Sequence, residues 1–135
     1  MARVIPTCLA LVLCDSVRRR ERGGDPSVVR AFAILRVGSL PTTSPPCCVW
    51  IHLTDGNGST AMELIVEHVP AGRLEPELVV AGKFTVEFAS PNEVLEHQAN
   101  FDNGIYLEKS GRYRLRLTAD GTTIMHRYFI VQLAS

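Results

Sequence analysis

The sequence predicts an all-β protein, an antiparallel β-sandwich of about seven to eight strands with an immunoglobulin-like arrangement. Turn residues recur at short intervals along the chain, and the segments between them are rich in β-branched and aromatic residues. No segment has the apolar spacing of a long amphipathic helix. A closed barrel is the main alternative.

Length and charge restrict the class of protein further. A chain of 135 residues predicts one domain spanning 1–135. Its 14 basic residues balance 14 acidic ones, so no net charge draws the chain to a nucleic acid or an anionic membrane. No apolar run approaches the roughly 20 residues of a membrane-spanning helix. We therefore expect a protein that binds neither nucleic acid nor membrane, and the cysteines described next indicate a cytoplasmic location.

The four cysteines lack the spacing of a disulfide framework and are predicted to be reduced; they are Cys8, Cys14, Cys47 and Cys48. Adjacent residues of a strand point to opposite faces, so at most one of Cys47 and Cys48 is expected to face the core.

The first predicted strand is the apolar run from Cys8 to Cys14. A basic residue precedes the run, as in a signal peptide, but Leu13 stands where such a peptide has a small residue before its cleavage site. A structural strand is therefore favoured.

The next predicted strand, Val28 to Val37, is apolar on both alternating faces, which is typical of a strand covered on two sides. The proline-rich stretch from Gly38 to Pro46 then connects it to the following element.

The clearest predicted hairpin joins Cys47–Thr54 to Thr60–Val69 across Asp55-Gly56-Asn57-Gly58. The core-facing residues of its two arms are predicted to be Val49, Ile51 and Leu53, then Met62, Leu64 and Val66. A further strand follows from Glu77, with Phe84, Val86 and Phe88 in phase.

The segment from Ser90 to Phe101 has two interpretations. Ser90 and Glu93 have the spacing of a helix capping box, but Leu95, His97, Ala99 and Phe101 alternate, and we favour a strand.

The last two strands form a hairpin that begins with Gly111-Arg112-Tyr113. A tyrosine at this place predicts a tyrosine corner, in which the ring is buried and the hydroxyl bonds a nearby backbone group. A two-residue turn at Asp120-Gly121 would place Arg114 opposite Arg127, which is unfavourable. A three-residue loop, Ala119 to Gly121, places Leu115 opposite Met125 and puts Phe129, Val131 and Leu133 on the core face, and we prefer this register.

Several motifs together resemble an uncharacterised bacterial family of small β-sandwich domains of unknown function. They are "LCDSV" at Leu13 to Val17, "SLPTTSPP", "IHLTDGNG" at Ile51 to Gly58, "MELIVEHV", and "GRYRLRLTADG" leading to "RYFIVQL". The resemblance implies a cytoplasmic β-sandwich and brings no activity, cofactor or partner. The arginine-rich loop from Arg18 to Arg22 and "DPSVVRAF" depart from the pattern and put the first hairpin in doubt.

A predicted interaction surface lies on the outer face of the last hairpin. In the preferred register three alternating arginines share this face with three apolar residues: Arg112, Arg114, Arg116, Ile124, Tyr128 and Ile130. A strand that is apolar on both faces needs a cover on its second face, either from the loops of its own chain or from another subunit. Alternating arginines are also what a solvated strand face shows, so nucleic-acid binding is not favoured.

An alternative site consists of acidic residues at strand ends, which could bind calcium or another ligand. Its residues are Asp55, Asn57, Asp102 and Asp120. An EF-hand loop starting at Asp55 fails, because its twelfth position is Val66 and not glutamate.

No zinc motif, nucleophile elbow or phosphate-binding loop is present, so neither a cofactor nor an enzyme activity is predicted. The leading hypothesis is a non-enzymatic module that associates with copies of itself or with a partner protein.

Overall fold

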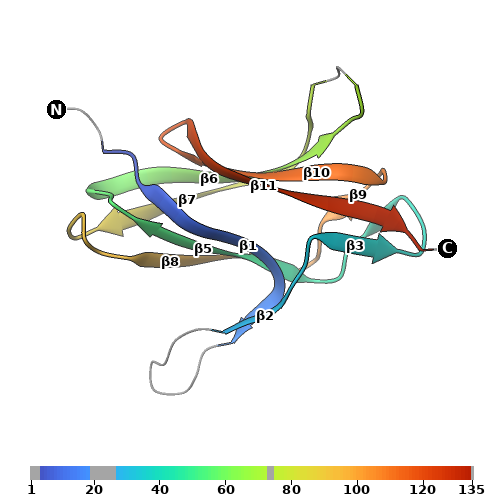
Figure 1. Ribbon diagram of the computed structural model, residues 1–135, viewed down its shortest axis with the longest axis horizontal. Coiled ribbons are helices and arrows are strands. Elements are labelled where there is room, and N and C mark those ends of the chain that lie inside the picture. Colours follow the sequence, from blue (N-terminus) through green and yellow to red (C-terminus); the bar gives the residue numbers. More distant parts are fainter. Residues whose placement is uncertain (1–3, 19–26, 73–74, 135) are drawn as a thin grey trace.

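The computed structural model describes residues 4–18, 27–72 and 75–134, and within them the protein is all-β (Figure 1). Eleven strands in this part of the chain form three sheets. None of the described residues belongs to a helix that is long and apolar enough to cross a membrane.

The first sheet has four antiparallel strands in the order β2-β1-β5-β8. Its strands are β1 (Thr7–Arg18), β2 (Ser27–Ala31), β5 (Cys47–Thr54) and β8 (Leu95–Phe101). The predicted first strand is therefore confirmed, and it continues beyond Cys14.

The second sheet has five strands in the order β3-β11-β10-β6-β7, and it curls like half of a barrel. Its strands are β3 (Ile34–Val37), β6 (Gly58–Val69), β7 (Glu77–Phe88), β10 (Gly111–Ala119) and β11 (Thr122–Leu133). The sheet is mixed, because β3 runs parallel to β11 while the other pairs are antiparallel. The short strands β4 (Thr42–Thr43) and β9 (Tyr106–Leu107) form the third sheet.

Side chains of both larger sheets form one hydrophobic core. The alternation predicted for two of the strands is confirmed, since the following residues are all buried: Val49, Ile51 and Leu53 of β5, and Met62, Leu64 and Val66 of β6. Alternate residues of a strand point to opposite faces, so this pattern fixes which face of each sheet lies against the core.

The predicted hairpin between β5 and β6 is wrong, although both strands are present. β5 pairs with β1 and β8 in one sheet, and β6 pairs with β10 and β7 in the other. The segment between them carries the chain across the core, with Asp55 at φ 63° and Gly58 at φ 68°. Alternating apolar residues describe a strand buried on one face, and this pattern is the same whether two strands are neighbours or face each other.

The single strand predicted from Val28 to Val37 is also wrong. The structure divides it into β2 and β3, which belong to different sheets. The backbone N–H of Phe32 donates to Leu13 O at 3.1 Å, and that of Ile130 donates to Ala33 O at 2.8 Å, so the chain changes sheets between these two residues. The run is apolar on both faces because it contains two short strands, and it is not covered on two sides, since Ile34 is exposed.

The segment from Ser90 to Phe101 was interpreted as a strand, and this is confirmed for its second part, β8. Ser90 and Glu93 do not form a capping box but belong to a turn, in which Glu93 N–H donates to the backbone carbonyl of Ser90 and Ala89 N–H donates to Glu93 Oε1, both at 3.1 Å. β8 begins only after this turn, at Leu95.

The preferred register of the last hairpin is wrong. Ala119 lies opposite Thr122, which gives the two-residue turn, and a bulge after Leu117 then moves the pairing so that Arg114 lies opposite Tyr128. The bulge thereby avoids the unfavourable pair of arginines. The actual pairing is shifted by two residues from the preferred one. Because side chains alternate with a period of two, most residues still point to the face that was predicted for them. Phe129 and Val131 are buried as expected, but Leu133 is exposed.

The tyrosine corner is confirmed. Tyr113 is 1% exposed, and its hydroxyl donates to Lys109 O at 2.6 Å. All four cysteines are free thiols and are buried. Cys47 belongs to the core, whereas Cys48 lies outside the core cluster beside Cys14, in agreement with the expectation that at most one of the neighbours faces the core.

Candidate functional site

The outer face of the five-stranded sheet brings most of the predicted interaction residues together. Arg112, Arg114 and Arg116 of β10 lie opposite Ile130, Tyr128 and His126 of β11, respectively, and opposite Val69, Glu67 and Ile65 of β6. Residues directly opposite each other in neighbouring strands share a face of the sheet. Ile124 is the exception among the predicted residues, because it follows the turn at the bulge and packs against the core.

Glu67 holds two of the three arginines. Its Oε2 accepts hydrogen bonds from Arg114 Nε and Nη2 at 2.9 and 2.6 Å, and its Oε1 accepts one from Arg116 Nη2 at 2.8 Å. Burial acts to raise the pKa of the Glu67 carboxyl, but the hydrogen bonds and charges of Arg116 and Arg114 outweigh it and lower the pKa below its ordinary value. The hydrogen bond to Glu67 in turn raises the pKa of Arg114. These side chains are therefore fixed by an ion triad within the chain.

The third arginine stacks on an aromatic ring. The guanidinium carbon of Arg112 lies 3.8 Å from the centre of the Tyr128 ring, which is the geometry of a cation–π contact. Arg112 and Tyr128 are thus held together on the face although both are exposed.

Apolar residues that the sequence analysis did not include extend this face on both sides. Ile34 of β3 lies opposite Ile130 and is 46% exposed, and Leu78 of β7 lies opposite Glu67 and is 69% exposed. Tyr128 between them is 40% exposed. No local pattern could have identified Ile34 or Leu78, because their place on this face depends on which strands flank the hairpin. We call this set of eight residues the outer face: Ile34, Glu67, Leu78, Arg112, Arg114, Arg116, Tyr128 and Ile130.

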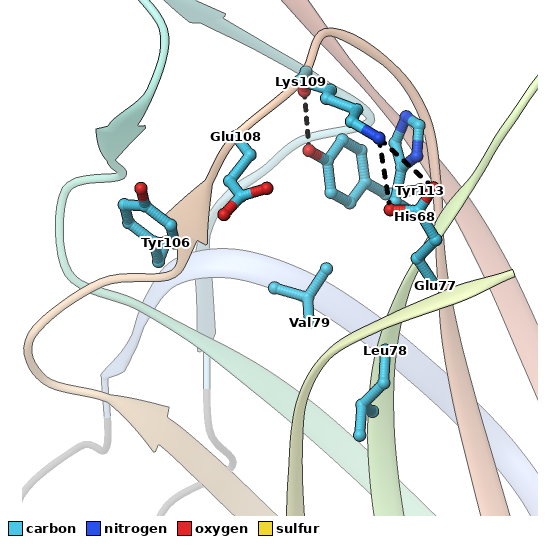
Figure 2. Close-up of a pocket in the computed structure, with 8 residues that line it drawn as sticks. All are labelled: His68, Glu77, Leu78, Val79, Tyr106, Glu108, Lys109 and Tyr113. Atoms are coloured by element: carbon cyan, nitrogen blue, oxygen red, sulfur yellow. Dashed lines mark hydrogen bonds and ion pairs between the residues drawn. The ribbon is translucent and has the colours of Figure 1, made fainter.

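A small pocket lies where Tyr113 closes the end of the core (Figure 2). Its volume is about 150 Å³, and the residues that line it are His68, Glu77, Leu78, Val79, Tyr106, Glu108, Lys109 and Tyr113. Lys109 Nζ lies 3.2 Å from Glu77 Oε1, and this ion pair spans one side of the pocket. His68 Nε2 lies 3.2 Å from Ser110 O, and its Nδ1 is buried without a hydrogen-bond partner in the described residues. The pocket meets the outer face only at Leu78.

The structure separates Asp102 from the other three residues of the alternative ligand site. The turn containing Asp120 is attached to the start of β6, where Asp120 Oδ1 accepts a hydrogen bond from Ala61 N–H at 3.2 Å, so it lies near the end of the molecule that holds Asp55 and Asn57. Asp102 follows Phe101, which pairs with Cys47 at the opposite end of β5. Within the described ranges no three His, Cys, Asp or Glu side chains are grouped so as to hold a metal ion.

The fold is similar to parts of larger proteins of known structure. It matches the alkylpurine DNA glycosylase AlkC of Pseudomonas fluorescens, determined bound to DNA containing an abasic site analog, with a TM-score of 0.53 and 9% sequence identity over 97% of this chain and 31% of that one. A β-glucoside glucohydrolase from Trichoderma reesei matches with a TM-score of 0.49 and 10% identity, over 95% of this chain and 19% of that one. A β-glucosidase from Listeria innocua matches with a TM-score of 0.46 and 13% identity, over 91% and 16%. The chain thus spans less than a third of the length of each of these proteins.

Among curated protein sequences none matches the chain. A family model does: that of a family of unknown function, DUF6941, matches residues 9–132, which is nearly the whole chain, and it confirms the resemblance inferred from the motifs. The chain therefore belongs to DUF6941, a family of unknown function.

Proposed function

We propose that the protein is a non-enzymatic association module that binds other protein chains through its outer face, and that a second copy of the chain is its first partner. The observation that carries this proposal is the combination of exposed Ile34, Leu78 and Tyr128 with arginines that already have fixed partners. Arginine and tyrosine are enriched among the residues that dominate binding energy at protein interfaces. Side chains held before binding lose little conformational entropy on association.

The size of the outer face suits a weak interface. The face extends over five strands, and β10 contributes nine residues. With about 4.8 Å between strands and 3.3 Å per residue, it measures roughly 19 by 30 Å, or about 600 Å². A standard interface buries about 800 Å² per partner, so an interface at the lower end of the range and a dissociation constant in the micromolar range are expected.

The proposal includes no binding to nucleic acid or membrane, no cofactor, and a cytoplasmic location. Arg114 and Arg116 are occupied by Glu67, so of the three arginines of β10 only Arg112 has no carboxylate partner among the described residues. The likeness to a DNA glycosylase is a likeness of fold and supplies no DNA-binding residue here. The cysteine spacing, which is not that of a disulfide framework, supports a reducing compartment.

We also propose that the fold is an immunoglobulin-like variant. Three features support it: the chain crosses between the sheets from β5 to β6, the tyrosine corner lies on the second-to-last strand, and the last two strands form a hairpin. An experimental structure in which β7 and β8 pair, so that the two sheets close into a barrel, would rule this proposal out.

Light scattering of the full chain at increasing concentration tests the association. We expect the mean mass to rise towards that of a dimer at several hundred micromolar, and Tyr128→Glu and Ile34→Glu to abolish the rise, because each replaces an apolar contact with a carboxylate that must lose its water on association. Val94→Glu is the matched control, since Val94 is 55% exposed in the connection between β7 and β8. A wild-type chain that stays monomeric, or a Val94→Glu variant that loses association as Tyr128→Glu does, would contradict the proposal.

A further inference from the structure

Two thiols meet in the middle of the four-stranded sheet. Cys14 of β1 and Cys48 of β5 are directly opposite each other, and their Sγ atoms are 3.3 Å apart. The neighbouring pair, Leu13 and Val49, points into the core. Cys14 and Cys48 therefore share the opposite face of the sheet, where Cys14 is 0% and Cys48 is 2% exposed.

Direct pairing across antiparallel strands is compatible with a disulfide. Directly opposite residues of antiparallel strands have Cα atoms about 4.5 to 5.5 Å apart, and disulfides span Cα separations of about 4.4 to 6.8 Å. The sulfur atoms need to approach by roughly 1.3 Å to reach a bond length of about 2.05 Å. A small rotation of each side chain provides this movement, so no strand has to shift.

The other two thiols are not placed to compete. Cys8 and Cys47 both belong to the core cluster, on the other face of the sheet from Cys14 and Cys48. Cys47 is next to Cys48 in the chain, but adjacent residues of a strand point in opposite directions. The register of β1 and β5 thus selects one pair of the four cysteines.

We propose that Cys14 and Cys48 are a modification site, at which a peroxide reversibly converts the two thiols into an intramolecular disulfide. One sulfur attacks the peroxide oxygen, forming a sulfenic acid and releasing one water from hydrogen peroxide. The second thiol then attacks the sulfenic sulfur, which forms the S–S bond and releases a second water. Two thiols lose two electrons and two protons in total, and the peroxide is reduced to two waters; an external thiol reductant reverses the reaction.

Burial makes the site slow to react in the native state. Desolvation, with the hydrogen bond to Cys48 adding to it, raises the pKa of Cys14 to about 12, so little of the reactive thiolate is present near neutral pH. The pair therefore remains reduced until an oxidant is supplied. The bond would then link the two central strands of the sheet and close the chain from residue 14 to residue 48, which restricts the unfolded state.

Mass spectrometry of the full chain tests the site. The protein is incubated with hydrogen peroxide, its remaining thiols are alkylated, and it is digested without reduction. We expect an intramolecular mass loss of two hydrogens, one linked peptide pair that contains Cys14 and Cys48, and a melting temperature roughly 5 to 10 °C above that of the reduced protein. A thiol reductant should return both the mass and the melting temperature.

Matched variants distinguish this pair from the other thiols. Cys47→Ser should still form the link, whereas Cys14→Ser and Cys48→Ser should not. If a variant fails to fold, as judged by circular dichroism, fragmentation of the linked wild-type peptides, which assigns the bonded cysteines, still decides the matter. A link through Cys47 or Cys8, disulfides only between molecules, or thiols that stay reduced or pass directly to sulfinic acid would each overturn the proposal.

Discussion

Glu67 is a carboxylate on the outer side of a sheet, yet its side chain is only 10% exposed because two arginines cover it. An ion pair on an open surface contributes little to stability, since water screens it and two long side chains lose freedom. The two hydrogen bonds from Arg114 to Oε2 and the further one from Arg116 to Oε1 make this triad different, because removing the carboxylate would leave two partly buried guanidinium groups without their partner.

Replacing Glu67 by glutamine is expected to lower the free energy of unfolding by about 1 to 3 kcal/mol at pH 7, as is typical of lost hydrogen bonds to charged groups. The folded state lowers the pKa of Glu67. Its contribution is therefore complete above the unfolded pKa of about 4.3 and is lost as the pH falls through the lower folded value. Urea unfolding of both proteins between pH 7 and pH 3 measures this difference, which should shrink with acidification.

Glu63→Gln provides the control for Glu67→Gln. Glu63 lies on the same strand and the same face, opposite Thr118 of β10 and Lys83 of β7, and makes no hydrogen bond or ion pair in the described residues. We expect its replacement to change the free energy of unfolding by no more than about 0.5 kcal/mol. A difference between wild type and Glu67→Gln that is independent of pH would show that the triad does not act through the charge of the carboxylate.

At the scale of the elements, the local pattern of apolar residues predicted where strands lie, but it did not predict which strands pair with each other. The bounds of β5 and the alternation of β6 could be predicted because each strand buries one face. Their pairing could not, because a turn sequence such as Asp55 to Gly58 suits a hairpin and also suits a crossing between sheets. Similarly, Val28 to Val37 is continuous in composition, and only the partners β1 and β11 reveal that it is two strands.

Gly104 and Gly121 have similar φ angles but different surroundings, so comparing them distinguishes backbone strain from steric conflict. Gly104 has φ 75° and Gly121 has φ 86°, and both values disfavour a side chain. A Cβ at Gly121 would meet nothing within 4 Å, whereas one at Gly104 would collide with the carbonyl group of Ser44. Ser44 cannot move away easily, because its backbone N–H donates to Ile105 O at 2.9 Å and its Oγ accepts from Ile105 N–H at 2.8 Å.

Gly121→Ala is therefore expected to cost about 1 to 2 kcal/mol, the penalty of a left-handed backbone, and Gly104→Ala about 1 to 3 kcal/mol more. Chemical denaturation of the two variants alongside the wild type gives both values. Equal losses in the two variants would mean that the contact between the turn after β8 and the Ser44 segment relaxes without cost.

At the scale of the whole molecule, the part of the candidate site that lies on a single strand could be predicted from the sequence. Residues on one strand keep their shared face whatever the fold, so Arg112, Arg114 and Arg116 could be grouped in advance. Glu67 and Leu78 could not be added, because their position beside the arginines follows from the order β10-β6-β7, which no local pattern encodes. For the same reason the separation of Asp102 from Asp55, Asn57 and Asp120 could not be predicted, since strand ends meet only if the strands run to the same end of the molecule.

Salt dependence distinguishes an apolar protein interface from a phosphate-binding surface. Three arginines that each neutralised one phosphate would lose roughly 500-fold in affinity over a tenfold rise in salt, from a slope of about −0.9 per contact. The outer face has its arginines paired internally and exposes Ile34, Leu78 and Tyr128, so its self-association should change by less than about threefold, because apolar burial is not screened. Sedimentation equilibrium at 50 and 500 mM sodium chloride, chosen as about one tenfold step, measures this ratio. Fluorescence polarisation with a labelled DNA duplex, under the same two conditions, should show no binding; steep loss of association with salt, or DNA binding that Arg112→Ala removes, would instead identify a surface that recognises polyanions.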